Sequence, residues 1–332
     1  MAKIVGAISM SHAPGATGWP DAPPADMRAR VEAHHASLAR FLDEAKPDVI
    51  VAFLDDHFEN HFRNLMPIFS VGVSDTHSGP PEHLQAAFGI DGTKVIGGES
   101  ALALALLNGL VERNFDVARM GEVEYGNNLI TPLQLIRPQY DIPVVPLFIN
   151  VFSPPVPTAA RAYAFGEAVR TIVDAYPGDQ HVLFLATGGL SHWPPVWTED
   201  SPDDDAFLQR MKRYQTEGRP VIAEDPHLYD DLAKYEVDMA AANQYPLNSP
   251  HPLVNELWDM DIMRGFERGD VDYFKTMNTE EIHRGGGHGG LEILNWIAVM
   301  GAMGGPPAQF VGYEPVLEWI CGMGYLTYPA QG

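Results

Sequence analysis

The chain has 332 residues, 45% of them hydrophobic, which is enough to bury a large core in one or two α/β domains. Aspartate and glutamate total 44 against 21 lysines and arginines, a formal net charge of −23, and this sign disfavours nucleic acid and anionic lipid as partners. The single cysteine, Cys321, excludes an intramolecular disulfide and a thiolate-rich metal site, and no segment reads as a signal peptide or a membrane span. We therefore predict a cytoplasmic protein with no nucleic-acid or membrane partner.

The first 190 residues contain short β-rich runs that alternate with helical patterns. The runs lie at 3–9, 48–54, 68–73, 142–150 and 181–188. They are continuously apolar rather than alternating, as is typical of strands with both sheet faces covered. This order predicts an α/β fold with a mainly parallel or mixed central sheet layered by helices.

The second half of the chain reads differently. From about residue 203 the pattern is mostly helical, which predicts a helical C-terminal half. There is no fixed-period repeat, and the proline-rich stretches are too short to be linkers. We predict one catalytic domain over residues 1–332, with a helical C-terminal segment from about residue 251.

Histidines follow three of the predicted strands. His12 comes directly after the first strand, His57 after the second, and His192 after the run at 181–188. In open α/β folds the carboxyl edge of the strands is where ligands bind. If the first two strands are neighbours, His12 and His57 lie side by side there and are candidate metal ligands.

A carboxylate is the expected third ligand. The predicted helix HPLVNELWDMDIMRGF carries Glu256 and Asp259, which are three residues apart and share a helix face. Two histidines and one carboxylate form the facial triad of non-haem iron(II) oxygenases, which leaves one face of the metal open. A further histidine would move protons, since its pKa is near neutrality.

Two other types of site are not supported. Ser191 is not in a G-x-S-x-G elbow, because Trp193 stands where the second glycine would be. The run GGGHGG at 285–290 lacks the Lys-Ser/Thr ending of a phosphate loop. His61, four residues after His57, is expected to be structural, and His288 is expected to mark the start of a helix.

Several motifs in order along the chain resemble the class III extradiol ring-cleavage dioxygenases, the family of the protocatechuate 4,5-dioxygenase catalytic subunit and 2,3-dihydroxyphenylpropionate dioxygenase. The resemblance covers almost the whole chain. It rests on SMSHAPG, DDHFENHFRNLMPIFSVGV, PVVPLFIN, FLATGGLSHWPP, NELWDMDIM, GGLEILNWIAVMGAM and VLEWICGMGYL.

This resemblance implies an Fe(II) enzyme that inserts both atoms of O2 into a catechol-type ring. It implies His12 and His57 as iron ligands, Glu256 as the carboxylate ligand with Asp259 as its rival, and His192 as the acid-base residue. Many family members carry Asp-His-Gly where this chain has Glu124, Tyr125 and Gly126. Tyr125 is then expected to donate a hydrogen bond to substrate, although a phenol with a pKa near 10 is a poor proton shuttle at neutral pH.

Two alternatives stay open on the sequence alone. A zinc-dependent hydrolase could use the same ligands, because the donor set does not decide between iron and zinc. An accessory subunit could keep the fold after losing the histidine at position 125. The substrate is an aromatic diol, with a carboxylated or lignin-derived phenol as one candidate, and a homo-oligomer is expected from the resemblance.

Overall fold

The computed structural model describes residues 1–193, 205–242 and 253–330. Its centre is an eight-stranded sheet with the strand order β6-β3-β7-β2-β8-β1-β10-β9, and β4 and β5 form a separate two-stranded sheet. The strands of both sheets are β1 (Lys3–Met10), β2 (Val49–Leu54), β3 (Phe69–Gly72), β4 (Thr76–Gly79), β5 (Lys94–Gly97), β6 (Val117–Met120), β7 (Val144–Ile149), β8 (His181–Thr187), β9 (Gln309–Val316) and β10 (Cys321–Pro329).

The four middle strands of the large sheet run parallel. β7 pairs with β2, β2 with β8, and β8 with β1, all in parallel register. Antiparallel pairs flank this block, with β3 on β7 at one side and β10 on β1 at the other. The carboxyl ends of β1, β2 and β8 therefore meet at one edge, and the sheet is mixed as the sequence predicts.

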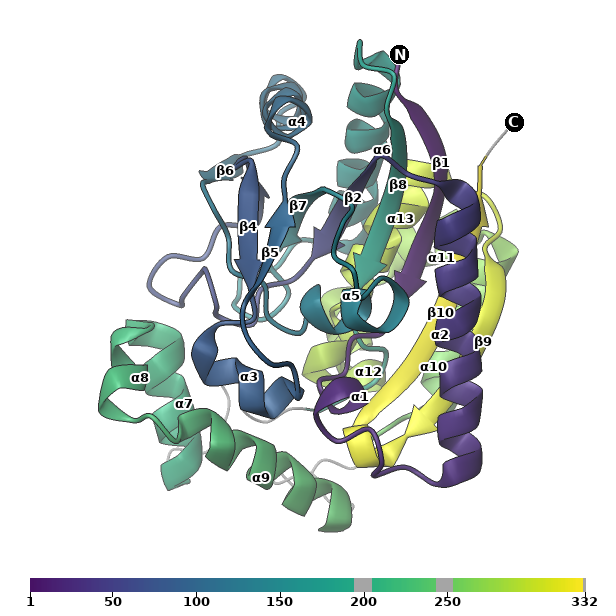
Figure 1. Cartoon of the computed structure of the whole chain (residues 1–332). Helices are drawn as coiled ribbons and strands as arrows, with labels where there is room; N and C mark the ends of the chain where they lie inside the picture. Colours follow the sequence, from purple (N-terminus) through teal and green to yellow (C-terminus); the bar gives the residue numbers. More distant parts are fainter. Residues whose placement is uncertain (194–204, 243–252, 331–332) are drawn as a thin grey trace.

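The middle strands are apolar because helices cover both faces of the sheet. Every residue of β2 and of β7 is buried. Helix α13 (Ile293–Met303) packs on α6 (Ala159–Ala175) and on β1, β2 and β8, while α2 (Ala25–Ala45) packs on β1, β9 and β10. In Figure 1 the two helical layers lie on opposite sides of the strands.

Most of α13 is apolar and all of its side chains are buried, which explains why ILNWIAVMGAM shows no polar face. The remaining helices are α1 (Gly15–Gly18), α3 (Glu82–Phe88), α4 (Ser100–Glu112), α5 (Ile130–Ile136), α7 (Ala206–Glu217), α8 (Pro220–Glu224), α9 (Leu228–Ala242), α10 (Glu256–Arg268), α11 (Val271–Thr276), α12 (Thr279–Gly290) and the short 3₁₀ helix η2 (Leu317–Trp319).

The α/β class with helical segments in the second half is confirmed, and one feature adds to it. The described residues from 205 to 303 are mainly helical, but β9 and β10 then form an antiparallel pair that extends the sheet beside β1. Their residues come last in the chain and lie next to the first strand. Among the described helices, none is both long and apolar enough to cross a bilayer.

Candidate active site

Three strand ends bring three histidines to one place. His12 lies two residues beyond β1, His57 three residues beyond β2, and His192 five residues beyond β8. β8 lies between β1 and β2 in the sheet, yet the imidazole rings of His12 and His57 have centroids only 5.1 Å apart. The expected pairing of these two histidines is therefore present in the structure, although their strands are not direct neighbours.

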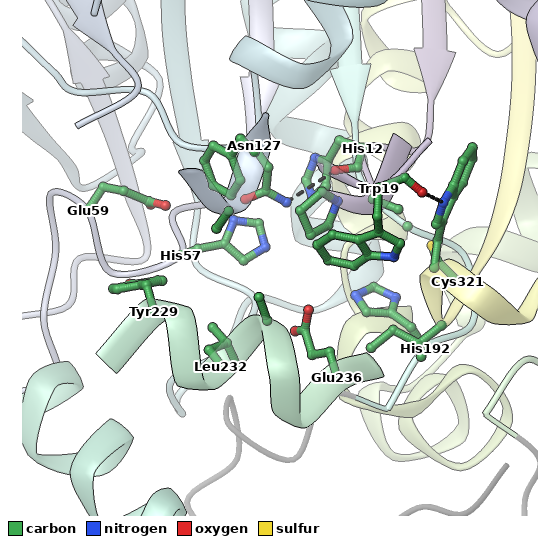
Figure 2. Close-up of a pocket in the computed structure, with 18 residues that line it drawn as sticks. His12, Trp19, His57, Glu59, Asn127, His192, Tyr229, Leu232, Glu236 and Cys321 are labelled. Carbon is green, nitrogen blue, oxygen red and sulfur yellow. Dashed lines mark hydrogen bonds between the residues drawn. The ribbon is translucent and has the colours of Figure 1, made fainter. Parts of the chain in front are cut away.

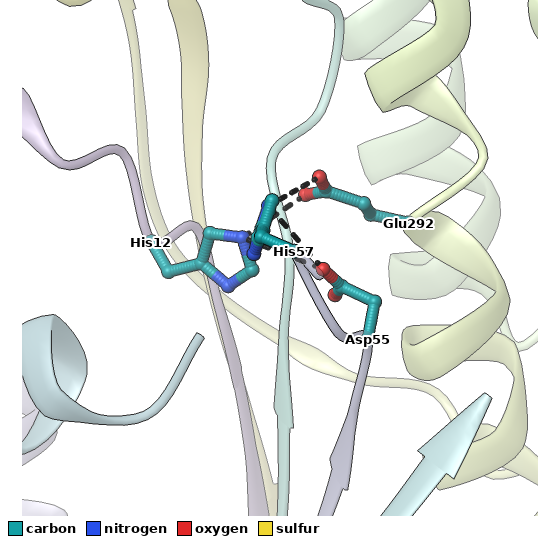
Figure 3. Close-up of side chains that lie close together, drawn as sticks. All are labelled: His12, Asp55, His57 and Glu292. Atoms are coloured by element: carbon teal, nitrogen blue, oxygen red, sulfur yellow. Dashed lines mark ion pairs between the residues drawn. The ribbon is translucent and has the colours of Figure 1, made fainter. Parts of the chain in front are cut away.

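A glutamate from a distant part of the chain completes this group. Glu292 lies between α12 and α13 and is fully buried. Its Oε2 atom is 3.3 Å from Nε2 of His12, and its Oε1 atom is 3.5 Å from Nε2 of His57. Both carboxylate oxygens thus face histidine nitrogens, as Figure 3 shows.

The loop after β8 is shaped to accept Glu292. The backbone N–H of Gly189 donates a hydrogen bond to Oε2 of Glu292. Gly188 has a φ of +156°, and a Cβ atom there would stand 2.8 Å from Cβ of Glu292. A side chain at position 188 would therefore collide with the glutamate, which is a physical reason for glycine at this turn.

Asp55 is the fourth member of the group. The group consists of His12, Asp55, His57 and Glu292, and all four residues are buried. Each offers one ligand atom, and these four atoms lie within 4.8 Å of one another. Oδ2 of Asp55 lies 3.4 Å from Nε2 of His57, and Asn295 on α13 donates a hydrogen bond of 2.8 Å to Oδ1. Asn295 also donates to the carbonyl of Thr187, so α13 fixes this carboxylate relative to the end of β8.

The group fits a divalent metal ion. Oδ2 of Asp55 is buried and accepts no hydrogen bond from the described residues, an arrangement that costs free energy unless a cation or donor is nearby. Imidazole nitrogens with carboxylate oxygens are the donor set of non-haem iron sites, and zinc accepts the same donors. The residues present can thus hold such a metal.

The pKa values of the Asp55 and Glu292 carboxyls are shifted in opposite directions. Burial and the adjacent Glu292 raise the pKa of Asp55 to about 8. Burial alone would also raise the pKa of Glu292, but His192 and His12 beside it bring that pKa well below its usual value. Glu292 is therefore the carboxylate that stays ionised in this group.

His192 stands next to this group without belonging to it. Its Nε2 atom lies 3.2 Å from Oε1 of Glu292, and its Nδ1 atom is 3.2 Å from the carbonyl oxygen of Leu190. Burial lowers the pKa of His192, but the carboxylate of Glu292 outweighs it and the pKa is raised. An imidazole at this position can hold or release a proton beside the group.

The glycine-rich run at 285–290 has a packing role around His192. A Cβ atom on Gly289 would stand about 2 Å from the His192 ring, at 1.9 Å from Nε2. His192 N–H donates to the carbonyl of Gly286, and Gly289 N–H donates to the carbonyl of His192. The run therefore lets α12 approach the histidine closely.

His288 in this run contacts a second histidine of α12. Its Nε2 atom lies 3.0 Å from Nε2 of His283.

The geometry corrects the expected carboxylate. Glu256 is the first residue of α10 and is exposed, and it is not in the group around His12 and His57. Its predicted rival Asp259 is fully buried but binds protein groups instead. Asp259 accepts hydrogen bonds from the Ser191 N–H, the Ser191 hydroxyl and the Tyr313 hydroxyl, each of 2.7 Å. Asp259 thus anchors the segment that carries His192.

Tyr125 also lies elsewhere than expected. It is fully buried, and its ring packs against His77 with centroids 5.6 Å apart. It is not among the described residues that line the cavity above the histidines, and its hydroxyl has no hydrogen-bond partner within the described chain. Burial raises its pKa well above the usual value. Asn127, two residues on, does line the cavity and donates a hydrogen bond to the carbonyl of His12.

A cavity opens above the group, with an empty volume of about 720 Å³ including its mouth. His12, His57 and His192 form part of its wall, and Trp19 and Trp319 form another part. Figure 2 shows helix α9 running along the opposite side. Trp193, one residue after His192, does not line this cavity and packs in a small separate apolar cluster.

Sequence reasoning missed three features of this site. Asp55 stands in LDDH two residues before His57, and an acidic residue at the end of a buried strand is a usable signal. Glu292 is the lone charged residue in GGLEILNWIAVMGAM, and a charge in an otherwise apolar segment is rarely buried without a partner. The contribution of α9 to the cavity has no sequence signal that we can name.

The fold and the site together define a mixed α/β protein with a buried group of two histidines and two carboxylates at the carboxyl edge of parallel strands. Residues 6–324 match the family model described as the catalytic LigB subunit of aromatic ring-opening dioxygenase. The chain belongs to this family, and it is an enzyme of the class III extradiol type, as the sequence motifs predict.

Curated relatives extend over nearly the whole chain. An enzyme of Burkholderia vietnamiensis named 2,3-dihydroxyphenylpropionate/2,3-dihydroxicinnamic acid 1,2-dioxygenase is 30% identical over 321 residues, which is 95% of this chain and 94% of the relative. Enzymes of the same name from Photorhabdus laumondii and Rhodococcus globerulus are 30% and 27% identical, over 96% and 92% of this chain and of each relative. The similarity therefore includes every element that builds the site.

Proposed function

We propose that this chain is an Fe(II)-dependent extradiol dioxygenase that binds an aromatic diol at the cavity and inserts both atoms of O2 into its ring. One observation carries the proposal: a buried group of two histidines and two carboxylates lies at the wall of a cavity that Trp19 and Trp319 also line. The names of the curated relatives support a diol with adjacent hydroxyls as the substrate class.

His12, His57 and Glu292 are the proposed iron ligands. Glu292 replaces Glu256 in this role because its two oxygens lie 3.3 Å and 3.5 Å from the Nε2 atoms of the two histidines. Asp55 is the weaker candidate for a third ligand, because its Oδ2 atom lies 4.0 Å from Nε2 of His12, against 3.3 Å for Oε2 of Glu292, and because Glu292 is the carboxylate held ionised. Three ligands on one face leave the opposite face of a metal open.

An iron ion held there would bind the diol and O2 together and supply the redox chemistry of ring opening. His192 is the proposed proton carrier: it accepts a proton from a diol hydroxyl and returns it to the opened product. Its contact with Glu292 favours the protonated imidazole and orients the ring. Trp19 and Trp319 exclude water from one side of the cavity and offer flat surfaces to an aromatic ring.

The protein environment suggests why the site is rigid before substrate binds. Asp55 is tied to α13 through Asn295, Glu292 is tied to the Gly189 N–H, and the segment of Ser191 is tied to Asp259. Ligands and proton carrier are thus held by buried side chains from separate elements. Such support keeps reacting groups in place and reduces reorganisation during the reaction.

Anaerobic loading of the purified chain with Fe(II), followed by O2 uptake on a panel of catechols, tests this function. We expect one O2 consumed per diol, a yellow product, and a product mass equal to diol plus 32 Da, reflecting two oxygen atoms. Zinc as the native metal with no O2 uptake on any diol would point to a hydrolase. Failure to bind any metal would point to an accessory subunit.

A further inference from the structure

The cavity wall carries two acidic side chains beyond the proposed iron group. Glu59 and Glu236 both line it, and they are 2% and 8% exposed. None of the described residues that line the cavity is a lysine or arginine. The segments 194–204, 243–252 and 331–332, which lie outside the described chain, contain no lysine or arginine either. Histidines are thus the only basic side chains among the described residues that line the cavity, and His192 already contacts Glu292.

Glu236 is the more informative of the two acids. It lies on α9, and Figure 2 shows its carboxylate pointing from that helix into the cavity, on the side of His192. Within the described chain it makes no hydrogen bond and no salt bridge, and burial, opposed by the charge of His192, raises its pKa to about 7. A ligand in the cavity can supply the hydrogen-bond donor that the described protein does not.

Glu59 lies on the neighbouring wall of the cavity. Its Oε2 atom is buried and without a hydrogen-bond partner among the described residues. The guanidinium of Arg219 donates to the backbone carbonyl of Glu59 and pairs with the carboxylate of Glu124. That arginine does not line the cavity, so it does not offset the two acids there.

We propose that the diol substrate carries a neutral or cationic substituent, whose hydroxyl, amide or amine donates a hydrogen bond to Glu236, and that a carboxylated diol is disfavoured. This inference rests on the proposed function and specifies its substrate class. The named relatives act on 2,3-dihydroxyphenylpropionate, an anion at neutral pH. Above the pKa of Glu236, about 7, a carboxylate beside it faces a like charge or must force a proton onto it, which disfavours the acid.

Three compounds of nearly equal size test the inference on the iron-loaded enzyme. They are 2,3-dihydroxyphenylpropionate, its primary amide, and the corresponding amine, 3-(3-aminopropyl)catechol. At pH 8, about one unit above the pKa of Glu236, we expect kcat/KM for the amide and the amine to exceed that for the acid by at least about tenfold, because the acid faces the charge of Glu236 or must protonate it. An acid that is turned over as well as the amide would overturn the inference.

Substitution of Glu236 connects the preference to one residue. In Glu236→Gln we expect the preference for the amide over the acid to fall by at least about tenfold, since one like charge is removed. Asp238→Asn is the matched control, because Asp238 is exposed on the same helix and the substitution changes the net charge equally. An unchanged preference in Glu236→Gln, with the folded state verified by circular dichroism, would contradict the role of Glu236.

Anaerobic binding separates this inference from the proposed function. Trp19 and Trp319 line the cavity, so quenching of tryptophan fluorescence reports ligand binding without turnover. Tighter binding of amide than acid, with no O2 uptake on any compound, would refute the dioxygenase proposal and keep the charge preference. Turnover with tighter binding of the acid would support the dioxygenase proposal and refute the charge preference. Binding of none of the three compounds would refute both.

Discussion

Nε2 of His192 lies 3.2 Å from Oε1 of Glu292, while the other oxygen of the same carboxylate lies 3.3 Å from Nε2 of His12. One glutamate therefore touches both the proposed proton carrier and a proposed iron ligand. This contact gives Glu292 two separable effects, one on metal affinity and one on the orientation of His192.

Replacing Glu292 by glutamine is expected to weaken iron binding more than about 100-fold, because loss of a ligand exceeds the 10–100-fold effect of losing a supporting group. Metal content after anaerobic loading and gel filtration measures this. Glu256→Gln is the matched control, since Glu256 is exposed at the start of α10, and it should retain full iron content. Iron loss in Glu256→Gln with retention in Glu292→Gln would restore the carboxylate predicted from the sequence.

The contrast between these two glutamates shows what sequence could and could not predict. His12, His57 and His192 follow strands, so the rule that parallel strands present their ends at one edge located them. Glu292 comes from the start of α13, and its position depends on how that helix packs against β1, β2 and β8. The lone charge in an apolar segment marks Glu292 as unusual but does not say which side chains it meets, whereas Glu256 lay in a helix whose acidic residues looked suitable.

The same distinction applies to the fold. Continuous apolar runs identified β1, β2, β7 and β8, because strands with both faces covered need apolar side chains throughout. β9 and β10 were not predicted. β9 includes exposed and half-buried positions, and β10, although buried except at its last residue, pairs with β1 from the opposite end of the chain. The position of α9 along the cavity likewise depends on tertiary packing and was not predicted.

His192→Ala is expected to lower kcat by about 10² to 10⁴-fold, the usual range for loss of a general acid-base group, with iron content unchanged. Steady-state O2 uptake on the best diol, with iron measured in the same sample, tests this. His61→Gln is the control, because Nε2 of His61 is 3.3 Å from the Ser70 hydroxyl, outside the cavity wall described here. If His192→Ala also lost its iron, His192 would be a ligand rather than a proton carrier.

Tyr125→Phe is expected to change kcat/KM by less than about twofold, because its hydroxyl neither lines the cavity nor has a hydrogen-bond partner among the described residues. Removing an unpaired buried hydroxyl should leave stability unchanged or raise it by up to about 1 kcal/mol. Urea unfolding and O2 uptake on one preparation give both values. A hundredfold loss of kcat would return Tyr125 to the substrate-binding role expected from the sequence.

Asp259→Asn is expected to destabilise the fold by about 2–3 kcal/mol, since an amide cannot accept all three hydrogen bonds that this buried carboxyl accepts from Ser191 and Tyr313. Tyr313→Phe removes only one of them and should cost about 1 kcal/mol. Urea unfolding measures both variants. Iron content should stay complete in Asp259→Asn, and its loss would revive Asp259 as a ligand.

Acid should destabilise the protein partly through His35. This side chain is 7% exposed and packs edge-on against Tyr325, and burial, with a smaller contribution from the charge of His34, lowers its pKa to about 3. In the unfolded chain its pKa is near 6.5. Between these values the unfolded state binds a proton that the native state does not, so stability falls as pH falls, by up to about 1.4 kcal/mol per pH unit for this group.

Urea unfolding at pH 7 and at pH 5 tests this contribution. The loss of unfolding free energy between the two pH values should be about 1–2 kcal/mol smaller in His35→Leu than in the wild type, because the variant has no proton to bind at this position. His227→Gln is the control, since the His227 side chain is 77% exposed, and its loss should match the wild type. An equal loss in His35→Leu and wild type would mean that the native state accommodates the protonated imidazole, and that acid sensitivity arises at other buried groups.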